Sequence, residues 1–185
     1  MKRILLYITI VVAFASCKGG IGGSSMTGEP GDMLVVINDE YKNTETGDKI
    51  QEILNEEEIG LTQSEAPFAI TVISKNNFSS TFRTYRNILN LEVDKKYAKA
   101  QIQYRKDLWA QHQAYVAVGA SSIEDLKNVV ELKHKKIIEF FVQAEIERYQ
   151  QLYKSANNQI AEKAVKDNFD LNISCPVGFN VNKIA

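Results

Sequence analysis

The sequence predicts an α+β domain in which a mixed or mostly antiparallel sheet of about five strands is covered by a long C-terminal helix. Two observations lead to this prediction. Short apolar stretches, separated by turn-forming or charged residues, recur between residues 33 and 120. A stretch with neither proline nor glycine then runs from Ser121 to Asn168, and apolar residues recur in it at helical spacing.

The expected strands differ in the arrangement of their apolar residues. Residues 33–37 are apolar throughout and lie between Gly31 and Asn38, which is typical of a strand buried on both faces. Residues 88–93 largely alternate, which is typical of a strand with one buried face. The expected strands are residues 33–37, 67–73, 88–93, 100–104 and 115–120, with short helices at about 46–55 and 76–85 between them.

The long helix is expected to begin at a capping box, because Ser121 and Glu124 have the required spacing. An unbroken helix to Asn168 would be roughly 72 Å long, which is more than one domain of this size can cover. Weak helix formers at residues 155–158 therefore predict a break near Asn157, followed by a shorter helix. Beyond it, residues 171–184 carry partly alternating apolar side chains and predict a further half-buried strand.

The first residues predict export. Lys2 and Arg3 precede 12 uncharged residues, which as a helix would span about 18 Å, well short of the ~30 Å hydrocarbon core of a membrane. This is typical of a signal peptide, here residues 1–16, and not of a membrane-spanning helix. The small residues before Cys17 resemble the bacterial lipobox, in which the cysteine is acylated, although Phe14 departs from the usual aliphatic residue. An ordinary signal peptide with an unmodified Cys17 is the alternative.

The segment after Cys17 is rich in glycine and serine, so we expect residues 17–31 to form a flexible tether. Residues 32–185 then form the α+β domain. This organisation predicts a protein of the cell envelope, anchored by lipid to the periplasmic or surface face of a bacterial membrane.

Composition and motifs exclude several classes of protein. The 22 basic and 23 acidic side chains give no basic excess, so we expect no nucleic-acid partner. The two histidines and two cysteines do not occur at the spacing of a zinc site, and the sequence predicts neither a metal nor another cofactor. Cys175 is expected to be a buried, inert thiol.

Arginine and aromatic residues provide the candidates for ligand binding, since together they suit carboxylates, phosphates and sugar faces. These candidates are Arg83, Arg86 and Trp109, and Arg105 lies near them in the sequence. A structural role for the same residues is the competing interpretation. Glu145 and Arg148, three residues apart, are expected to pair on one helix face.

Four segments together resemble a family of uncharacterised envelope lipoproteins of the Bacteroidetes type. They are Gly28-Glu29-Pro30-Gly31, Thr84-Tyr85-Arg86-Asn87-Ile88-Leu89, Asp107-Leu108-Trp109-Ala110-Gln111 and Glu145-Ile146-Glu147-Arg148. The resemblance implies no catalytic residues, because the family has no assigned activity. It also implies that the chain is truncated, with a domain incomplete at its C-terminus, because members continue beyond a segment like Cys175–Phe179.

The leading hypothesis is a non-enzymatic binding or assembly module that is anchored through Cys17 and contacts an envelope protein or a glycan. The alternative is a membrane-anchored envelope hydrolase acting on glycan or peptide, with carboxylates from Asp39, Glu40 or Asp107. A third hypothesis is an assembly subunit whose last strand pairs with another chain.

Overall fold

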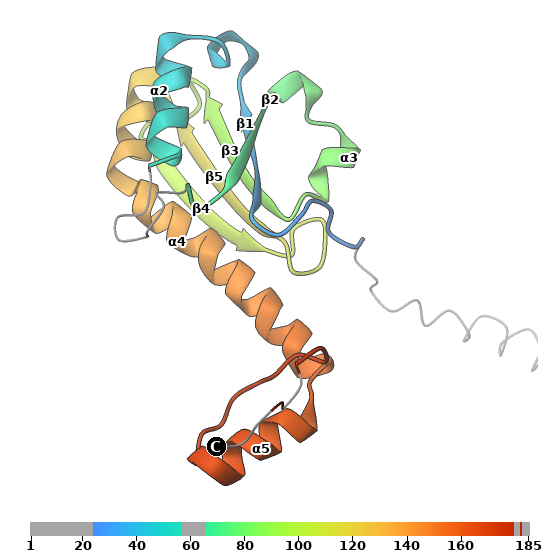
Figure 1. The fold of residues 1–185 in the computed structure, drawn as a ribbon. Coiled ribbons are helices and arrows are strands. Elements are labelled where there is room, and N and C mark those ends of the chain that lie inside the picture. Colours follow the sequence, from blue (N-terminus) through green and yellow to red (C-terminus); the bar gives the residue numbers. More distant parts are fainter. Residues whose placement is uncertain (1–23, 57–65, 180–181, 183–185) are drawn as a thin grey trace, which may run out of the picture.

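A computed structural model of the chain describes residues 24–56, 66–179 and 182, and Figure 1 shows its arrangement. The strands are β1 (Asp32–Ile37), β2 (Ala69–Ser74), β3 (Asn87–Val93), β4 (Gln101–Lys106) and β5 (Ala114–Ala120). The helices are α2 (Glu45–Leu54), α3 (Ser80–Arg83), α4 (Ile123–Ser155) and α5 (Gln159–Phe169), with single 3-10 turns η1 (Asp39–Tyr41) and η2 (Lys75–Asn77).

The strands form one mixed sheet in the order β2-β1-β3-β5-β4. β2, β1, β3 and β5 are parallel, and only the edge strand β4 runs antiparallel to its neighbour. The predicted α+β class is confirmed, and of the two predicted sheet types the mixed one is correct. All of the predicted strands between residues 33 and 120 occur in the sheet, and the helix predicted at 46–55 occurs as α2.

Alternate residues of β1 pack on opposite faces of the sheet, as its uninterrupted apolar sequence requires. Met33, Val35 and Ile37 belong to the main core, on the face covered by α2 and α4. Leu34 and Val36 belong to a smaller core on the other face, which the region around α3 covers only in part. The apolar stripe of α4 completes the main core with Leu126, Val130, Ile137, Ile138, Phe141 and Ala144.

The long helix extends beyond the sheet. α4 has 33 residues and is therefore about 50 Å long, whereas a strand of six or seven residues spans roughly 20 Å. The last buried residue of α4 is Arg148. The helix ends at Ser155, and α5 begins at Gln159, so the predicted break near Asn157 and the second helix are confirmed. In Figure 1 the end of α4 and all of α5 project away from the sheet.

Two local predictions need correction. The cap of α4 is Ser122, whose hydroxyl accepts the Asp125 N–H at 3.1 Å, one position later than the predicted capping box at Ser121. The predicted C-terminal strand does not join the sheet within the described residues. It folds back on the break between α4 and α5, where the Asn158 N–H donates to the Cys175 carbonyl at 2.7 Å, and it lies beyond the reach of either sheet edge. The Cys175 thiol is buried, as predicted.

The packed part of the chain begins within the segment expected to be a tether. The backbone of Thr27 pairs with the segment before β3: its N–H donates to the Thr84 carbonyl, and its carbonyl accepts the Arg86 N–H. Gly28 has a φ of +91°, and an added Cβ there would lie 3.1 Å from the Tyr85 ring, so this turn requires glycine. The signal peptide and Cys17 lie outside the described residues. Within the described ranges, no helix is both long and apolar enough to span a bilayer.

The core contact between α4 and the sheet yields the first prediction. Phe141 is fully buried and contacts Phe68 and Phe140 through edge-on ring packing. We expect Phe141→Ala to lower the free energy of unfolding by about 3–5 kcal/mol, because it removes buried apolar surface and leaves a cavity. Denaturation in urea measures this change. The control Leu132→Ala removes a side chain that is 75% exposed on the same helix, and an equal loss there would contradict the assignment of the core face.

Candidate functional site

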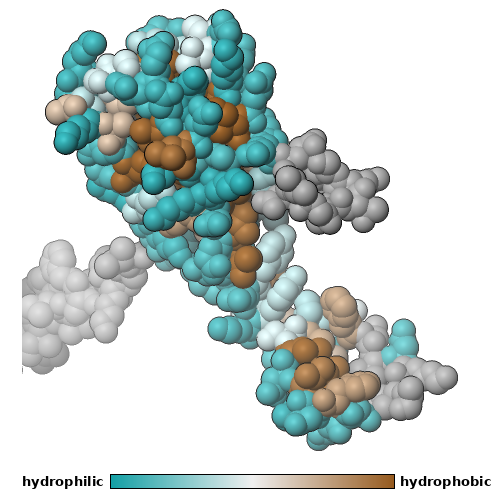
Figure 2. All heavy atoms as spheres, turned by 90° about the vertical axis from the view of Figure 1, so that its left-hand side faces the viewer, coloured by the Kyte–Doolittle hydropathy of each residue, from teal (hydrophilic) through white to brown (hydrophobic). Residues whose placement is uncertain are grey.

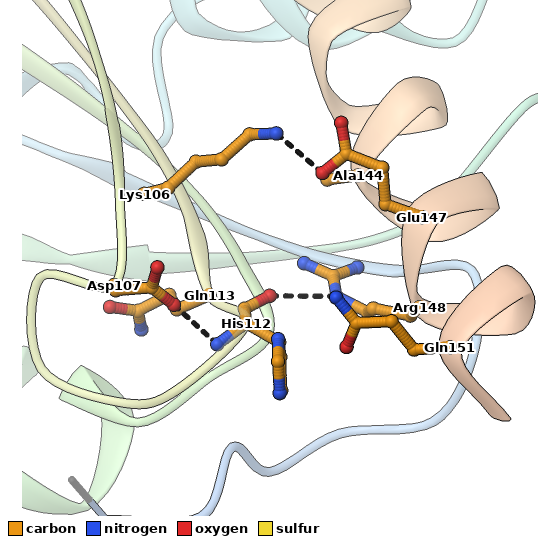
Figure 3. A pocket seen from close by; sticks show the side chains of 8 residues that line it. All are labelled: Lys106, Asp107, His112, Gln113, Ala144, Glu147, Arg148 and Gln151. Atoms are coloured by element: carbon orange, nitrogen blue, oxygen red, sulfur yellow. Dashed lines mark hydrogen bonds and ion pairs between the residues drawn. The ribbon is translucent and has the colours of Figure 1, made fainter. Parts of the chain in front are cut away.

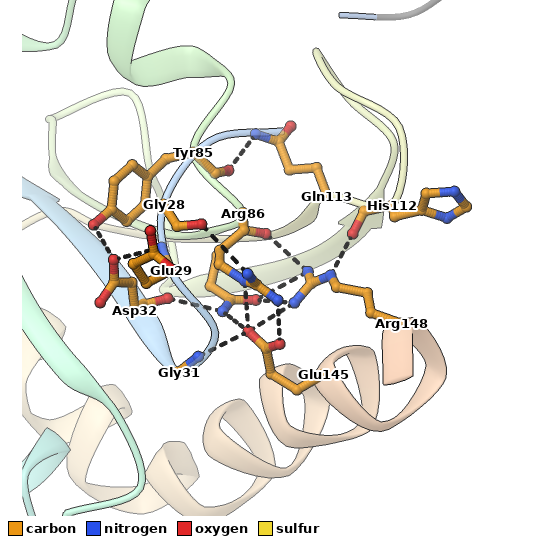
Figure 4. A network of polar contacts seen from close by, with 11 residues as sticks. Gly28, Glu29, Gly31, Asp32, Tyr85, Arg86, His112, Gln113, Glu145 and Arg148 are labelled. Carbon is orange, nitrogen blue, oxygen red and sulfur yellow. Dashed lines mark hydrogen bonds and ion pairs between the residues drawn. The ribbon is translucent and has the colours of Figure 1, made fainter. Parts of the chain in front are cut away.

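Buried polar side chains gather where α4 crosses the amino ends of the parallel strands (Figure 4). Glu145 and Arg148 come from α4, and Arg86 and Asn87 from the start of β3. All four are at most 9% exposed. Since charged side chains are rarely buried without partners, their contacts determine whether α4 can pack here.

The Glu145 carboxylate is the centre of this cluster. Its two oxygens accept a forked pair of hydrogen bonds from Arg86, with Nε at 2.9 Å from Oε1 and Nη2 bonded to Oε2. Asn87 Nδ2 donates to Oε1 at 2.7 Å, and Arg148 Nη1 lies 2.9 Å from the same oxygen. The predicted pairing of Glu145 and Arg148 is thus confirmed. Burial alone raises the pKa of Glu145, but these donors outweigh burial and hold the pKa below its ordinary value.

Two arginines share one carboxylate here, so one positive charge remains to be compensated by dipoles. Arg148 donates to the backbone carbonyls of His112 at 2.8 Å and Arg86 at 2.9 Å, and to the side-chain oxygen of Asn87 at 3.1 Å. Arg86 adds a bond of 3.3 Å to the Gly28 carbonyl. These oxygens take the place of water around the buried cations.

The cluster joins four segments that are far apart in the sequence. They are the turn before β1 (residues 28–31), the start of β3 (84–89), the β4–β5 loop (107–113) and the part of α4 at 145–148. These are the segments, with the loop extended by two residues, whose sequences resemble a common family. Their shared position explains why these short motifs occur together in one chain.

The side-chain amide of Gln113 holds the β4–β5 loop in place, a role that no sequence pattern indicated. Its amide nitrogen donates to the carbonyls of Arg83 at 2.6 Å and Tyr85 at 2.7 Å, and its amide oxygen accepts the Trp109 N–H at 3.1 Å. Asp107 and His112 at the two ends of the loop both have a left-handed φ, +55° and +62°. The Asp107 carboxylate accepts the His112 N–H and closes the loop.

A polar hollow of about 110 Å³ lies between this loop and α4 (Figure 3). Its lining residues are Lys106, Asp107, His112, Gln113, Ala144, Glu147, Arg148 and Gln151. Sites for small-molecule ligands usually have volumes of roughly 300–1,000 Å³, so the hollow has room for a few water molecules or a small ion and not for a sugar ring with its neighbours.

The charged groups that line the hollow already have partners: Lys106 pairs with Glu147, Asp107 accepts the His112 N–H, and Arg148 pairs with Glu145. Glu147 Oε2 lies 2.5 Å from Lys106 Nζ, and this contact is the main reason why the pKa of Glu147 is lowered. A carboxyl group held ionised in this way is poorly suited to donate a proton as a general acid. Among the residues that the structure describes, no three histidine, cysteine or acidic side chains converge as metal ligands would.

The structure separates the ligand-binding candidates. Trp109 packs edge-on against Tyr115, with ring centroids 5.2 Å apart, and the exposed Arg83 lies over Trp109 at 5.9 Å from its centroid. Arg86 does not join them, because its guanidinium is buried against Glu145. Arg105 lies opposite Tyr115 in the β4–β5 register, on the same side of the sheet.

In many sheets of parallel strands, ligands bind at the carboxyl ends of the strands. In this chain these ends lie opposite to the Glu145 cluster, which is at the amino ends. From β1 the chain adds β2 on one side and β3 on the other, so the strand order reverses at β1 and β3. At the carboxyl ends of these strands the Asn38 side chain donates to the Val93 carbonyl at 3.2 Å and accepts the Val93 N–H at 2.8 Å. No sequence pattern indicated this role for Asn38.

The carboxylates proposed for a hydrolase do not meet. Asp39 and Glu40 follow β1 at the carboxyl edge, whereas Asp107 follows the antiparallel β4 and lies at the amino edge. Strands of this length separate the two edges by roughly 20 Å, and the paired carboxylates of glycosidases are only about 5–9.5 Å apart.

Removing the central carboxylate tests the cluster. We expect Glu145→Gln to lower the free energy of unfolding by about 3–5 kcal/mol, because it leaves buried cations without their counter-charge. Glu147→Gln, two residues away on the surface of the same helix, should cost less than about 1 kcal/mol. Urea denaturation at neutral pH compares the two, and similar losses would mean that the cluster does not fix α4.

Glu92, at the end of β3, gives a prediction for pH. Burial raises its pKa, but hydrogen bonds from Lys75, Tyr97 and Lys96 outweigh burial and lower it from 4.5 to about 2. The stabilisation is therefore complete above about pH 4.5 and is lost as the pH falls towards 2. We expect wild type to exceed Glu92→Gln in unfolding free energy at pH 6, with the gap narrowing towards pH 2.5. A gap independent of pH would contradict the assignment.

Comparison with known proteins places the cluster in a recognised domain. Residues 26–154 match a family described as a domain of unknown function, DUF8532. Neither curated proteins nor solved structures gave a match. The matched region runs from the turn before β1 to the last turn of α4, so it includes the buried cluster and ends before α5. Because this region covers more than half of the sequence, the chain belongs to the DUF8532 family, as the predicted membership of an uncharacterised family required.

Proposed function

We propose that the protein is a lipid-anchored envelope protein, held at a bacterial membrane through Cys17, and that it is a non-enzymatic assembly module. The part that contacts other proteins is the projecting arm, defined as residues 149–179, which comprises the end of α4, α5 and the segment after it. The signal peptide at residues 1–16 and the lipobox-like sequence support the anchor.

The exposed apolar surface of the arm carries this proposal. The arm contains most of the large apolar side chains that are exposed in the described residues: Tyr149, Leu152, Ile160, Phe169, Leu171, Ile173, Val177 and Phe179. Figure 2 shows apolar atoms along the helix below the body and again around α5. Concentrated apolar surface of this kind usually marks a contact with another protein.

The body of the domain supports the same proposal, because it offers little space to a small-molecule ligand. The hollow has a volume of only about 110 Å³, and at the carboxyl ends of the strands the Asn38 side chain is bonded to the Val93 backbone. The surface where the exposed Arg83 lies over Trp109 offers a second candidate contact, for an envelope glycan. This contact does not involve the arm.

The alternative of an envelope hydrolase acting on glycan or peptide depends on the hollow. Asp107, Glu147 and His112 line it together, which is the observation in its favour. Asp107 is occupied by the His112 N–H and Glu147 by Lys106. These contacts hold both carboxylates in place beside a hollow of only about 110 Å³, so we favour the assembly module.

Photo-cross-linking in cells tests the proposal. A photoreactive residue at Leu152 or Ile160 of the arm should give a cross-linked product of higher mass on a denaturing gel. The same residue at Asn77, which is exposed in η2 on the body of the domain, should give none. Absence of a product at both arm positions would overturn the assembly function.

The anchor is tested in the same cells by Cys17→Ser, which removes the thiol that would be acylated. We expect this variant to leave the membrane fraction, because a single cysteine carries the lipid chains that hold the protein there. Unchanged membrane association would contradict the anchor while leaving the result for the arm intact.

A further inference from the structure

We infer that α4 pairs in antiparallel orientation with α4 of a second copy of this chain. The contact is a seam formed by Val142, Ile146, Tyr149 and Tyr153. This inference rests on the proposed function and names the partner of part of the same surface. The seam lies within the region that defines the family, residues 26–154, whereas α5 lies outside it.

The four seam residues occupy one face of the helix. They follow each other at steps of four, three and four, which is the spacing of a coiled-coil stripe. Val142, Ile146 and Tyr149 are each about 40% exposed, at 37%, 43% and 40%. The rings of Tyr149 and Tyr153 lie 5.9 Å apart, which confirms that they share this face. The face that packs on the sheet is a different one, containing Phe141, Ala144, Glu145 and Arg148.

The spacing of the seam is the same in both directions along the helix, so the seam can pair with a second copy of itself about a two-fold axis. When two such helices run antiparallel about a point between residues 147 and 148, Ile146 of one copy meets Tyr149 of the other. Val142 then meets Tyr153. Each contact joins an aliphatic side chain to an aromatic ring, and each occurs twice, as a two-fold interface requires.

The residues beside the seam permit this pairing. Gln143 and Gln150 flank it and face each other across the antiparallel interface, so no like charges meet there. The antiparallel arrangement also sends the two sheets to opposite ends of the helix pair. In a parallel arrangement both sheets would lie at the same end, and identical residues would face each other.

The area of the interface requires more than the seam. Stable protein interfaces usually bury roughly 1,200 Å² or more in total, which four side chains from each copy do not supply. In the antiparallel register, the end of α4 lies at the level of residue 140 of the second copy. Each copy also has two further large apolar side chains that are more exposed than any other in the described residues, Leu132 of α4 at 75% and Ile160 of α5 at 79%, and they supply additional apolar surface outside the seam.

Disulfide formation between differently tagged copies tests the pairing. The full chain is expressed with Cys175→Ser, one copy carrying Ile146→Cys and the other Tyr149→Cys, and the membranes are oxidised under mild conditions. A disulfide needs Cα atoms about 4.4–6.8 Å apart. We therefore expect at least about five-fold more cross-tag disulfide than when both copies carry Ile146→Cys. Lys133→Cys in both copies is the control for random collision.

Each outcome decides the inference. More product from two Ile146→Cys copies than from the mixed pair would show a parallel pairing and overturn the antiparallel seam. Product no greater than for Lys133→Cys would exclude pairing through this face. If pairing is excluded but photo-cross-links from Leu152 or Ile160 persist, the arm binds a different protein, and the assembly function stands without the dimer.

Discussion

The position of α4 depends on one buried carboxylate. Glu145 supplies one negative charge, which Arg86 and Arg148 share, and the remaining positive charge is compensated by backbone carbonyls and the side-chain oxygen of Asn87. Apolar packing along α4 would tolerate some sliding of the helix, because hydrophobic attraction has no direction. The forked bonds between Glu145 and Arg86 do have direction. They fix where along its length α4 crosses the sheet, and with it the turn before β1 and the loop before β5.

Once the crossing point is fixed, the length of α4 determines the shape of the molecule. The cluster lies at the amino edge of the strands, so every helical turn after Arg148 extends past the sheet. Those turns cannot be buried by the domain itself, yet they and α5 carry apolar side chains. Isolated helices gain little stability from propensity alone, so a helix end of this kind is stabilised by what packs against it. The exposed arm is therefore a consequence of the same contact that holds the domain together.

Much of the fold could be predicted from the sequence, because periodicity reports burial directly. The strand at Met33–Ile37, the helical stripe through Phe141 and the break near Asn157 all follow from local patterns, and each is present in the structure. The cluster could be predicted only in part. The spacing of Glu145 and Arg148 indicated a pair, but their partner Asn87 and the loop-holding Gln113 are single polar residues without a pattern. The strand expected after residue 171 failed because alternation shows only that a segment could lie on a sheet. It does not show that a sheet edge is within reach.

Recognition by another protein, as proposed, uses the part of the molecule that lies beyond the sheet. At the carboxyl ends of β1 and β3, the Asn38 side chain bonds to the Val93 backbone. At the amino ends, the Glu145 cluster holds α4, and the hollow beside it has a volume of about 110 Å³. The groups named here bond within the chain at both ends of the strands, whereas large apolar side chains of the projecting helix remain exposed. Because surface of this kind usually marks a contact with another protein, the proposed function rests on the arm.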